Sequence, residues 1–154
     1  DTSVRENTRG VFARGAPTIR IADIGDGTSN TLLLGETLPQ FCEFQRYNGA
    51  TGVGWAGGNY IAQGQTIQPL NWKIDKSNEP AFSSCQCDMN SNPSGDKARC
   101  IMNWAVTWGF KSNHPNGANF ALADGSQRFI TDSIEMRTYQ YLGCRDDGQP
   151  VTVP

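Results

Sequence analysis

A β-hairpin is the feature that most constrains the fold of this chain, and residues 110–130 predict it. Apolar residues occupy every second position from Ala118 to Leu122, and the alternation resumes from Gln127. Such a period of two is typical of a strand with one buried face. Asp124-Gly125 separates the two runs. Because Gly adopts positive φ without a Cβ clash, Asp-Gly favours a tight turn at this point.

Three further elements are predicted from local patterns. The apolar run Leu32–Leu34, bounded by a glycine, predicts a short buried strand. A helix is predicted over residues 133–142, with Asp132 and Glu135 in the positions of a capping box and Gly143 placed to end it. The tail from Val151 predicts a short edge strand.

Composition limits the class of protein. The chain has 154 residues, 17 glycines and only 18% charged residues, which favours a loop-rich β or α+β domain over a helical bundle. The net charge of −2 gives no basic footprint for nucleic acid. No apolar run approaches the length of a membrane span.

Five cysteines predict disulfide bonds rather than a zinc site. Cys85 and Cys87 form a C-x-C pair that lacks a second pair, and the chain has one histidine. The odd count leaves one thiol free or paired outside the chain. A disulfide bond from Cys85 or Cys87 to Cys100 would close a loop. It would stabilise the fold by roughly 3 kcal/mol, because it lowers the entropy of the unfolded chain. The pairing stays open among the five candidates, which are Cys42, Cys85, Cys87, Cys100 and Cys144.

His114 is the only histidine, and the sequence allows two roles for it. It could serve as a general base or a metal ligand. We favour a structural role, in which it orders the approach to the hairpin by hydrogen bonds. Pro115 and Asn116-Gly117 follow it and indicate a turn, and no nucleophile-elbow motif accompanies it.

Carboxylates beside glycine turns offer a second candidate site. Asp23, Asp26-Gly27 and Asp124-Gly125 could bind a hard cation through oxygen atoms. The favoured interpretation is that these aspartates accept hydrogen bonds from backbone amides, as Asp does in turns.

The polar loop over residues 78–100, bracketed by cysteines, contains a weak calcium pattern. Oxygen-bearing side chains alternate in the order of a calcium loop, but Pro93 replaces the required Gly and Arg99 the required Glu. A solvated loop is therefore favoured over a metal site. Calcium is the one cofactor that the sequence suggests, and its candidate ligands are Asp88, Asn90, Asn92, Ser94 and Asp96.

Two separated stretches carry a resemblance to a known family. The first runs from His114 through nine residues to Asp124-Gly125, and the second is Arg20–Glu36. Both resemble signatures of prepilin-like secreted proteins that are abundant in planctomycetes and carry a His-x9-Asp-Gly motif. Below, these two stretches are called the C-terminal and the N-terminal signature segments.

The resemblance implies a fold and a function. The expected fold is α+β, a single type IV pilin-like head over residues 1–154 with a mainly antiparallel sheet. The family's long apolar helix is expected upstream of Asp1, whether it was removed in the cell or during preparation, and it would be the only link to a membrane. The implied function is a non-catalytic, disulfide-bonded subunit of a filament at the cell surface, outside the cell or in the periplasm, built by self-association or with related subunits.

The sequence leaves an alternative open. Four tryptophans and the Asp88–Asp96 loop are also consistent with a secreted or cell-surface module that binds glycan or calcium. The sequence does not distinguish a true pilus from a secretion pseudopilus. An enzyme ranks third, because the candidate residues have no recognised catalytic spacing.

Overall fold

The computed structural model describes residues 9–12, 18–38, 64–72, 108–149 and 151–153. The chain divides into two compact units. Unit 1 comprises residues 1–36 and 112–154, and unit 2 comprises residues 37–111. The expectation of a single domain stays a prediction.

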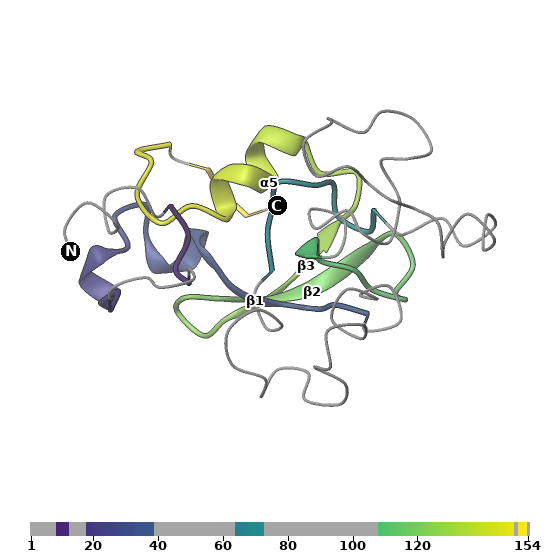
Figure 1. Cartoon of the computed structure of the whole chain (residues 1–154), viewed down its shortest axis with the longest axis horizontal. Coiled ribbons are helices and arrows are strands. Elements are labelled where there is room, and N and C mark those ends of the chain that lie inside the picture. Colours follow the sequence, from purple (N-terminus) through teal and green to yellow (C-terminus); the bar gives the residue numbers. More distant parts are fainter. Residues whose placement is uncertain (1–8, 13–17, 39–63, 73–107, 150, 154) are drawn as a thin grey trace, which may run out of the picture. The chain divides into compact units, whose positions relative to one another are not determined.

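Unit 1 contains a three-stranded antiparallel sheet (Figure 1). Strand β1 is Leu32–Gly35, β2 is Gly117–Leu122 and β3 is Gln127–Thr131, in the order β1-β2-β3. The predicted α+β fold, with an antiparallel sheet and a short C-terminal helix, is confirmed. Strand β1 comes from the N-terminal signature segment and β2 lies in the C-terminal one, so the sheet joins the two.

The predicted hairpin connects β2 and β3. Gly125 has φ 84°, and its amide donates to the Leu122 carbonyl at 3.0 Å. The Leu122 amide donates to the Ser126 carbonyl at 2.9 Å. A left-handed residue at this place closes a three-residue hairpin loop with a bulge, which explains the need for Gly. The pairing then runs to Gly117 opposite Thr131.

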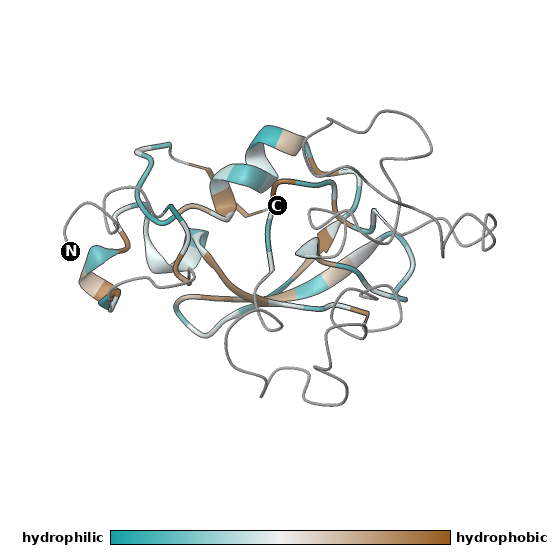
Figure 2. Cartoon of the chain, in the orientation of Figure 1, coloured by the Kyte–Doolittle hydropathy of each residue, from teal (hydrophilic) through white to brown (hydrophobic). Residues whose placement is uncertain are grey.

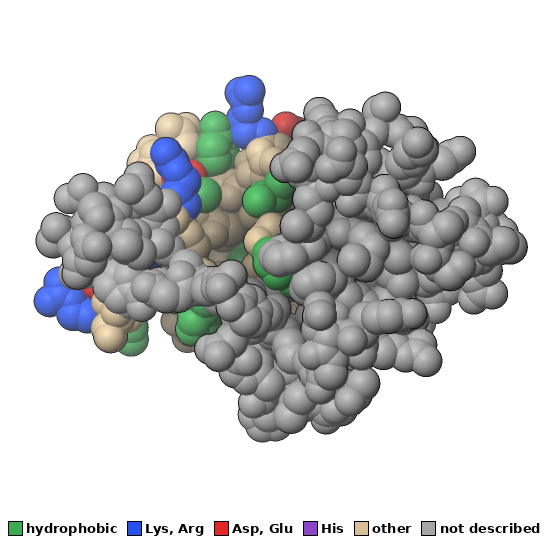
Figure 3. All heavy atoms as spheres, viewed as in Figure 1, with side chains coloured by type: hydrophobic (Ala, Val, Ile, Leu, Met, Phe, Trp, Pro, Cys, Tyr) green, Lys and Arg blue, Asp and Glu red, His purple; other side chains and the backbone are tan. Residues whose placement is uncertain are grey.

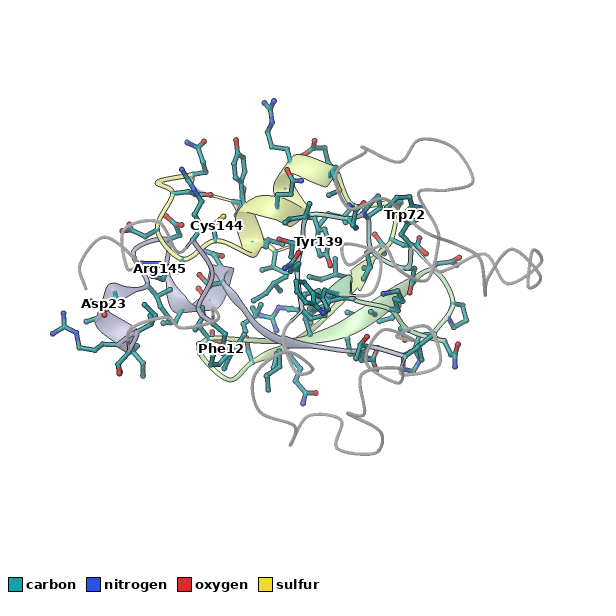
Figure 4. All side chains as sticks on the ribbon, in the orientation of Figure 1. Phe12, Asp23, Trp72, Tyr139, Cys144 and Arg145 are labelled. Carbon is teal, nitrogen blue, oxygen red and sulfur yellow. The ribbon has the colours of Figure 1, made fainter. Side chains whose placement is uncertain are left out.

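One face of the sheet forms the core of unit 1, and Figure 2 shows hydrophobic residues in its strands. Ala118, Phe120 and Leu122 alternate onto this face, as predicted, and are at most 2% exposed. Tyr139 from the C-terminal helix meets Phe120 edge to face, with ring centroids 6.2 Å apart. Figure 4 shows Tyr139 on the side of the helix that faces the sheet. Among the described residues of unit 1, the other buried apolar ones are Leu32, Ile130 and Leu142.

The opposite face of the sheet is partly open, which corrects one expectation. The run Leu32–Leu34 does form β1, but only Leu32 is buried, and Leu34 is 60% exposed. The register shifts between these two residues, so β1 carries an irregularity there and Leu34 pairs with Ala121. The open face also carries Phe129, which is 44% exposed.

The C-terminal helix α5 is Met136–Leu142, shorter than the predicted 133–142. Glu135, and not Asp132, is its N-cap: the Glu135 carboxylate accepts the Thr138 amide at 2.7 Å. Hydrogen bonds from the backbone amides of Arg137 and Thr138 lower the pKa of Glu135. Residues 132–134 form a turn instead, in which the Ile134 amide donates to the Thr131 carbonyl. Gly143 ends the helix as predicted, although its φ of −80° is right-handed.

Two 3-10 helices precede β1 in the N-terminal signature segment. They are η1, Ile21–Asp23, and η2, Thr28–Asn30. The tail residues 151–153 form no strand, so the predicted edge strand is wrong. In the described part of the chain, no helix combines the length and apolar character needed to cross a membrane.

The described residues of unit 2 show local backbone contacts. The Gln65 amide donates to the Trp108 carbonyl at 2.8 Å, within an isolated parallel bridge to Gly109. The Asn71 amide donates to the Phe110 carbonyl at 3.1 Å. Leu70 is 5% exposed. These hydrogen bonds place residues 64–72 beside residues 108–110, near the C-terminal end of unit 2.

Gly117 is a position where the fold tolerates no side chain. A Cβ there would meet the Ile130 carbonyl oxygen and lie 2.7 Å from the Phe129 ring. We expect Gly117→Ala to lower the free energy of unfolding by about 1–3 kcal/mol, the usual cost of overpacking. Urea unfolding measures it. Gly148→Asn is the control, because Gly148 has open space around it and Asn tolerates its φ of 69°. Equal effects of the two substitutions would contradict this account.

A substitution at Tyr139 should not lower the free energy of unfolding, in contrast to Gly117→Ala. Its hydroxyl is buried and has no hydrogen-bond partner among the described residues, and burial raises its pKa. Burying an unsatisfied hydroxyl costs about 1–3 kcal/mol. Tyr139→Phe should therefore keep or increase the free energy of unfolding in a thermal or urea melt. The half-buried Tyr141, replaced by Phe, is the matched control, and a clear loss of stability confined to Tyr139→Phe would refute the prediction.

Candidate functional site

The tip of the hairpin docks on the N-terminal signature segment. The Asp124 amide donates to the Thr28 carbonyl at 3.0 Å, and the Ala123 amide donates to the Thr31 carbonyl at 2.9 Å. The Asp124 carboxylate accepts the Ser126 amide at 2.8 Å. Hydrogen bonds from Ser126 lower the pKa of Asp124, so its carboxylate is an ionised acceptor within its own turn.

Asp23 binds the residue three positions before it, Arg20. It accepts the Arg20 amide at 2.8 Å and the Arg20 guanidinium at 2.9 Å. The hydrogen bond that Arg20 donates to Asp23 raises the pKa of Arg20, whose side chain is 71% exposed. These bonds close the turn of η1, at the end of unit 1 labelled Asp23 in Figure 4.

Asp26 binds backbone amides that are distant in sequence. Its carboxylate accepts the Asp147 amide at 2.8 Å and the Gly148 amide at 2.9 Å, and its own amide donates to the Arg145 carbonyl at 3.1 Å. Asp26 thus fixes the segment after α5, where Figure 4 labels Arg145. The turn at Gly27, with φ 94°, is closed by the Thr31 hydroxyl donating to the Gly27 carbonyl at 3.1 Å.

Glu36 joins the two signature segments at the other end of the sheet. Its carboxylate accepts the Asn119 backbone amide at 2.9 Å and the Asn119 side-chain amide at 3.2 Å. Its own amide donates to the Asn119 carbonyl at 3.3 Å. Burial raises the pKa of Glu36, but hydrogen bonds from Asn119 and Ser112 and the charge of His114 outweigh it and lower the pKa. We call Glu36, Ser112, His114 and Asn119 the Glu36 junction.

His114 lies at the edge of this junction. Its Nε2 is 3.3 Å from Glu36 Oε1, and its side chain is 53% exposed. Its ring meets Phe129 edge to face at 6.3 Å. The His114 amide donates to the Ser112 hydroxyl at 3.0 Å. An exposed ion pair of this kind contributes only about 0–1 kcal/mol, so the hydrogen bonds of Glu36 dominate the junction.

Ser, His and Glu therefore meet here, but in a different order from a catalytic triad. In a triad the imidazole lies between the hydroxyl and the carboxylate and accepts the proton of the hydroxyl. Here the carboxylate is the central group, with Ser112, His114 and Asn119 arranged around it. A carboxylate with a lowered pKa is ionised at neutral pH and suits hydrogen-bond acceptance better than proton donation.

Sequence reasoning missed the main residues of the junction. In the sequence, Glu36 stands out only as the last residue of the N-terminal signature segment, and no motif singles out Asn119 or Ser112. One signal was available: Asn119 is the polar residue inside the otherwise apolar strand Ala118–Leu122. Its partner lies 83 residues away in sequence, and spacing alone gives no indication of that distance.

The candidate metal and disulfide residues are placed only in part. The calcium candidates Asp88, Asn90, Asn92, Ser94 and Asp96 lie outside the described residues, as do Cys42, Cys85, Cys87 and Cys100. Within the described ranges, no group of three or more His, Cys, Asp or Glu side chains is arranged to hold a metal ion. Cys144 carries a free, half-buried thiol just after α5, whose pKa burial and Asp147 raise to about 11 (Figure 4). Such a thiol is a weak nucleophile.

Basic side chains do not form a continuous surface in the part that is visible. In Figure 3, the Lys and Arg side chains of the described residues stand apart on the face shown. This agrees with the low net charge of the chain.

Comparison with known proteins places both signature segments in one family. A family model described as "Protein of unknown function (DUF1559)", SBP_bac_10, matches residues 1–137. The chain belongs to the DUF1559 family. The DUF1559 match spans both signature segments and ends within α5. No curated protein and no solved structure matches the chain.

The lowered pKa of Glu36 predicts how stability depends on pH. Because the folded-state pKa lies below the ordinary value of 4.5, the contribution of Glu36 is complete above that value and is lost as the pH falls through the lower, folded-state pKa. The effect is modest, since solvent screens a partly exposed group. Urea unfolding at a series of acidic pH values should show a shallower pH dependence in Glu36→Gln than in the wild type.

The difference between the two proteins isolates Glu36, because Asp124 and Glu135 also have lowered pKa values and are present in both. Identical pH profiles of wild type and Glu36→Gln would contradict the role given to this carboxylate.

Proposed function

We propose that this DUF1559 protein is a non-catalytic structural subunit of a pilus-like or pseudopilus-like filament. The observation that supports the proposal is that the carboxylates of the signature segments bind backbone amides. Backbone amides of unit 1 donate hydrogen bonds to the carboxylates of Asp23, Asp26, Asp124 and Glu36. Carboxylates that bind backbone amides in this way maintain the shape of unit 1, which a subunit that packs into a filament requires.

The resemblance of the two segments to prepilin-like proteins supplies the kind of assembly. In this proposal the subunit is exported and lies at the cell surface, outside the cell or in the periplasm. Its partners are further copies of itself or related subunits. A long apolar helix upstream of the head would hold it in the membrane before assembly and in the filament core afterwards.

The open face of the sheet is compatible with packing between subunits. Leu34 and Phe129 leave apolar surface exposed beside polar neighbours such as Gln127. Mixed surfaces of this composition are common where protein subunits meet. In the proposed filament, contacts between heads use such surfaces and loops.

Electron microscopy of the native protein tests the proposal. We expect filaments with a regular axial rise in material recovered from the cells that make this protein. Sedimentation of the same material should show large assemblies. Recovery of the full-length native protein only as monomers would contradict the filament. Discrete particles would favour a secreted binding module, and calorimetry with calcium and a glycan panel would then be the relevant measurement.

A further inference from the structure

Residues 37–111 leave unit 1 and return to it at one place. Glu36 is the last residue of unit 1 before this segment, and Ser112 is the first residue after it. The Glu36 carboxylate takes hydrogen bonds from the side chain of Ser112 and from the backbone and side chain of Asn119. The two ends of the intervening segment are therefore held together by contacts within unit 1 itself.

We propose that residues 37–111 are an insertion into unit 1, and that unit 1 is an independent scaffold. Glu36 closes the neck of this scaffold, which is the place between Glu36 and Ser112 where the insertion leaves and returns. The described core of unit 1 draws on both sides of the insertion. Leu32 comes from before it, and Phe120, Leu122 and Tyr139 come from after it. Strand β1 pairs with β2 across the same gap in the sequence.

The neck needs a specific closure because β1 is short. It has four residues and an irregularity between Leu32 and Leu34, so its ladder alone gives few hydrogen bonds. Glu36 continues the pairing past Gly35 through the Asn119 carbonyl and adds two bonds through its carboxylate. Once both ends are fixed, the entropic cost of the connection grows only with the logarithm of its length. A long insertion is then compatible with a stable scaffold.

The two units differ in the types of residue that they contain. All four tryptophans and four of the five cysteines lie in residues 37–111, together with the Asp88–Asp96 loop. Unit 1 contains the only histidine and the hydrogen bonds that join the signature segments. The inference does not rest on the filament, since a scaffold with an insertion would serve a filament subunit or a binding module equally.

This distribution provides one spectroscopic probe for each unit of the intact chain. Tryptophan fluorescence reports unit 2, and the His114 ring resonances in proton NMR report unit 1. Urea unfolding of the full-length chain is followed by both probes, in the wild type, in Glu36→Ala and in Gln127→Ala. Gln127 is an exposed residue of β3 away from the neck and serves as the control.

Glu36→Ala should lower the folding equilibrium constant reported by His114 about tenfold, because the Asn119 amides lose their acceptor. The midpoint reported by tryptophan should not move, and Gln127→Ala should move neither. If Glu36→Ala unfolds unit 1 outright while the tryptophan transition persists, the proposal is supported, and Glu36→Gln then gives the graded effect. Equal shifts of both transitions in Glu36→Ala would overturn it, as would no shift of the His114 transition.

Discussion

The hydrogen bond from the Asn119 amide to the Glu36 carboxylate is the interaction on which the join between the two signature segments depends. An ionised acceptor makes a hydrogen bond stronger than a neutral one does. The carboxylate also receives the Asn119 side chain, so one residue of β2 is bound at two points. At the other end of the sheet, Thr28 and Thr31 receive the backbone of the hairpin tip. Strand β1 is thus held at both ends, which offsets its shortness.

On this account, the His-x9-Asp-Gly motif of the DUF1559 chain describes a piece of architecture. Gly125 provides the left-handed turn, Asp124 closes it through Ser126, and His114 stands at the Glu36 junction where β2 begins. The nine residues between His114 and Asp124 therefore cover the length of one strand and its flanking turns. The spacing follows from the distance between the two ends of the sheet that the motif joins.

The sequence predicted those elements whose cause is local. The hairpin and the end of α5 follow from alternation or from a glycine within a few residues. The start of α5 was misplaced, because Asp132 and Glu135 both fit a cap and only tertiary context selects Glu135. The exposure of Leu34 was missed because an irregularity in β1 cannot be inferred from three identical leucines. The Glu36 junction does not follow from local patterns because Glu36 and Asn119 are 83 residues apart in the sequence.

Hydrogen exchange at the Asn119 backbone amide tests the central claim most directly. In the intact chain this amide donates to Glu36 Oε2, so its exchange should be slow in the wild type and at least about tenfold faster in Glu36→Ala. In Gln127→Ala, which leaves the Glu36 carboxylate in place, the Asn119 amide should exchange as slowly as in the wild type. If the Asn119 amide exchanges equally fast with and without the Glu36 carboxylate, the two signature segments are not joined in the way described.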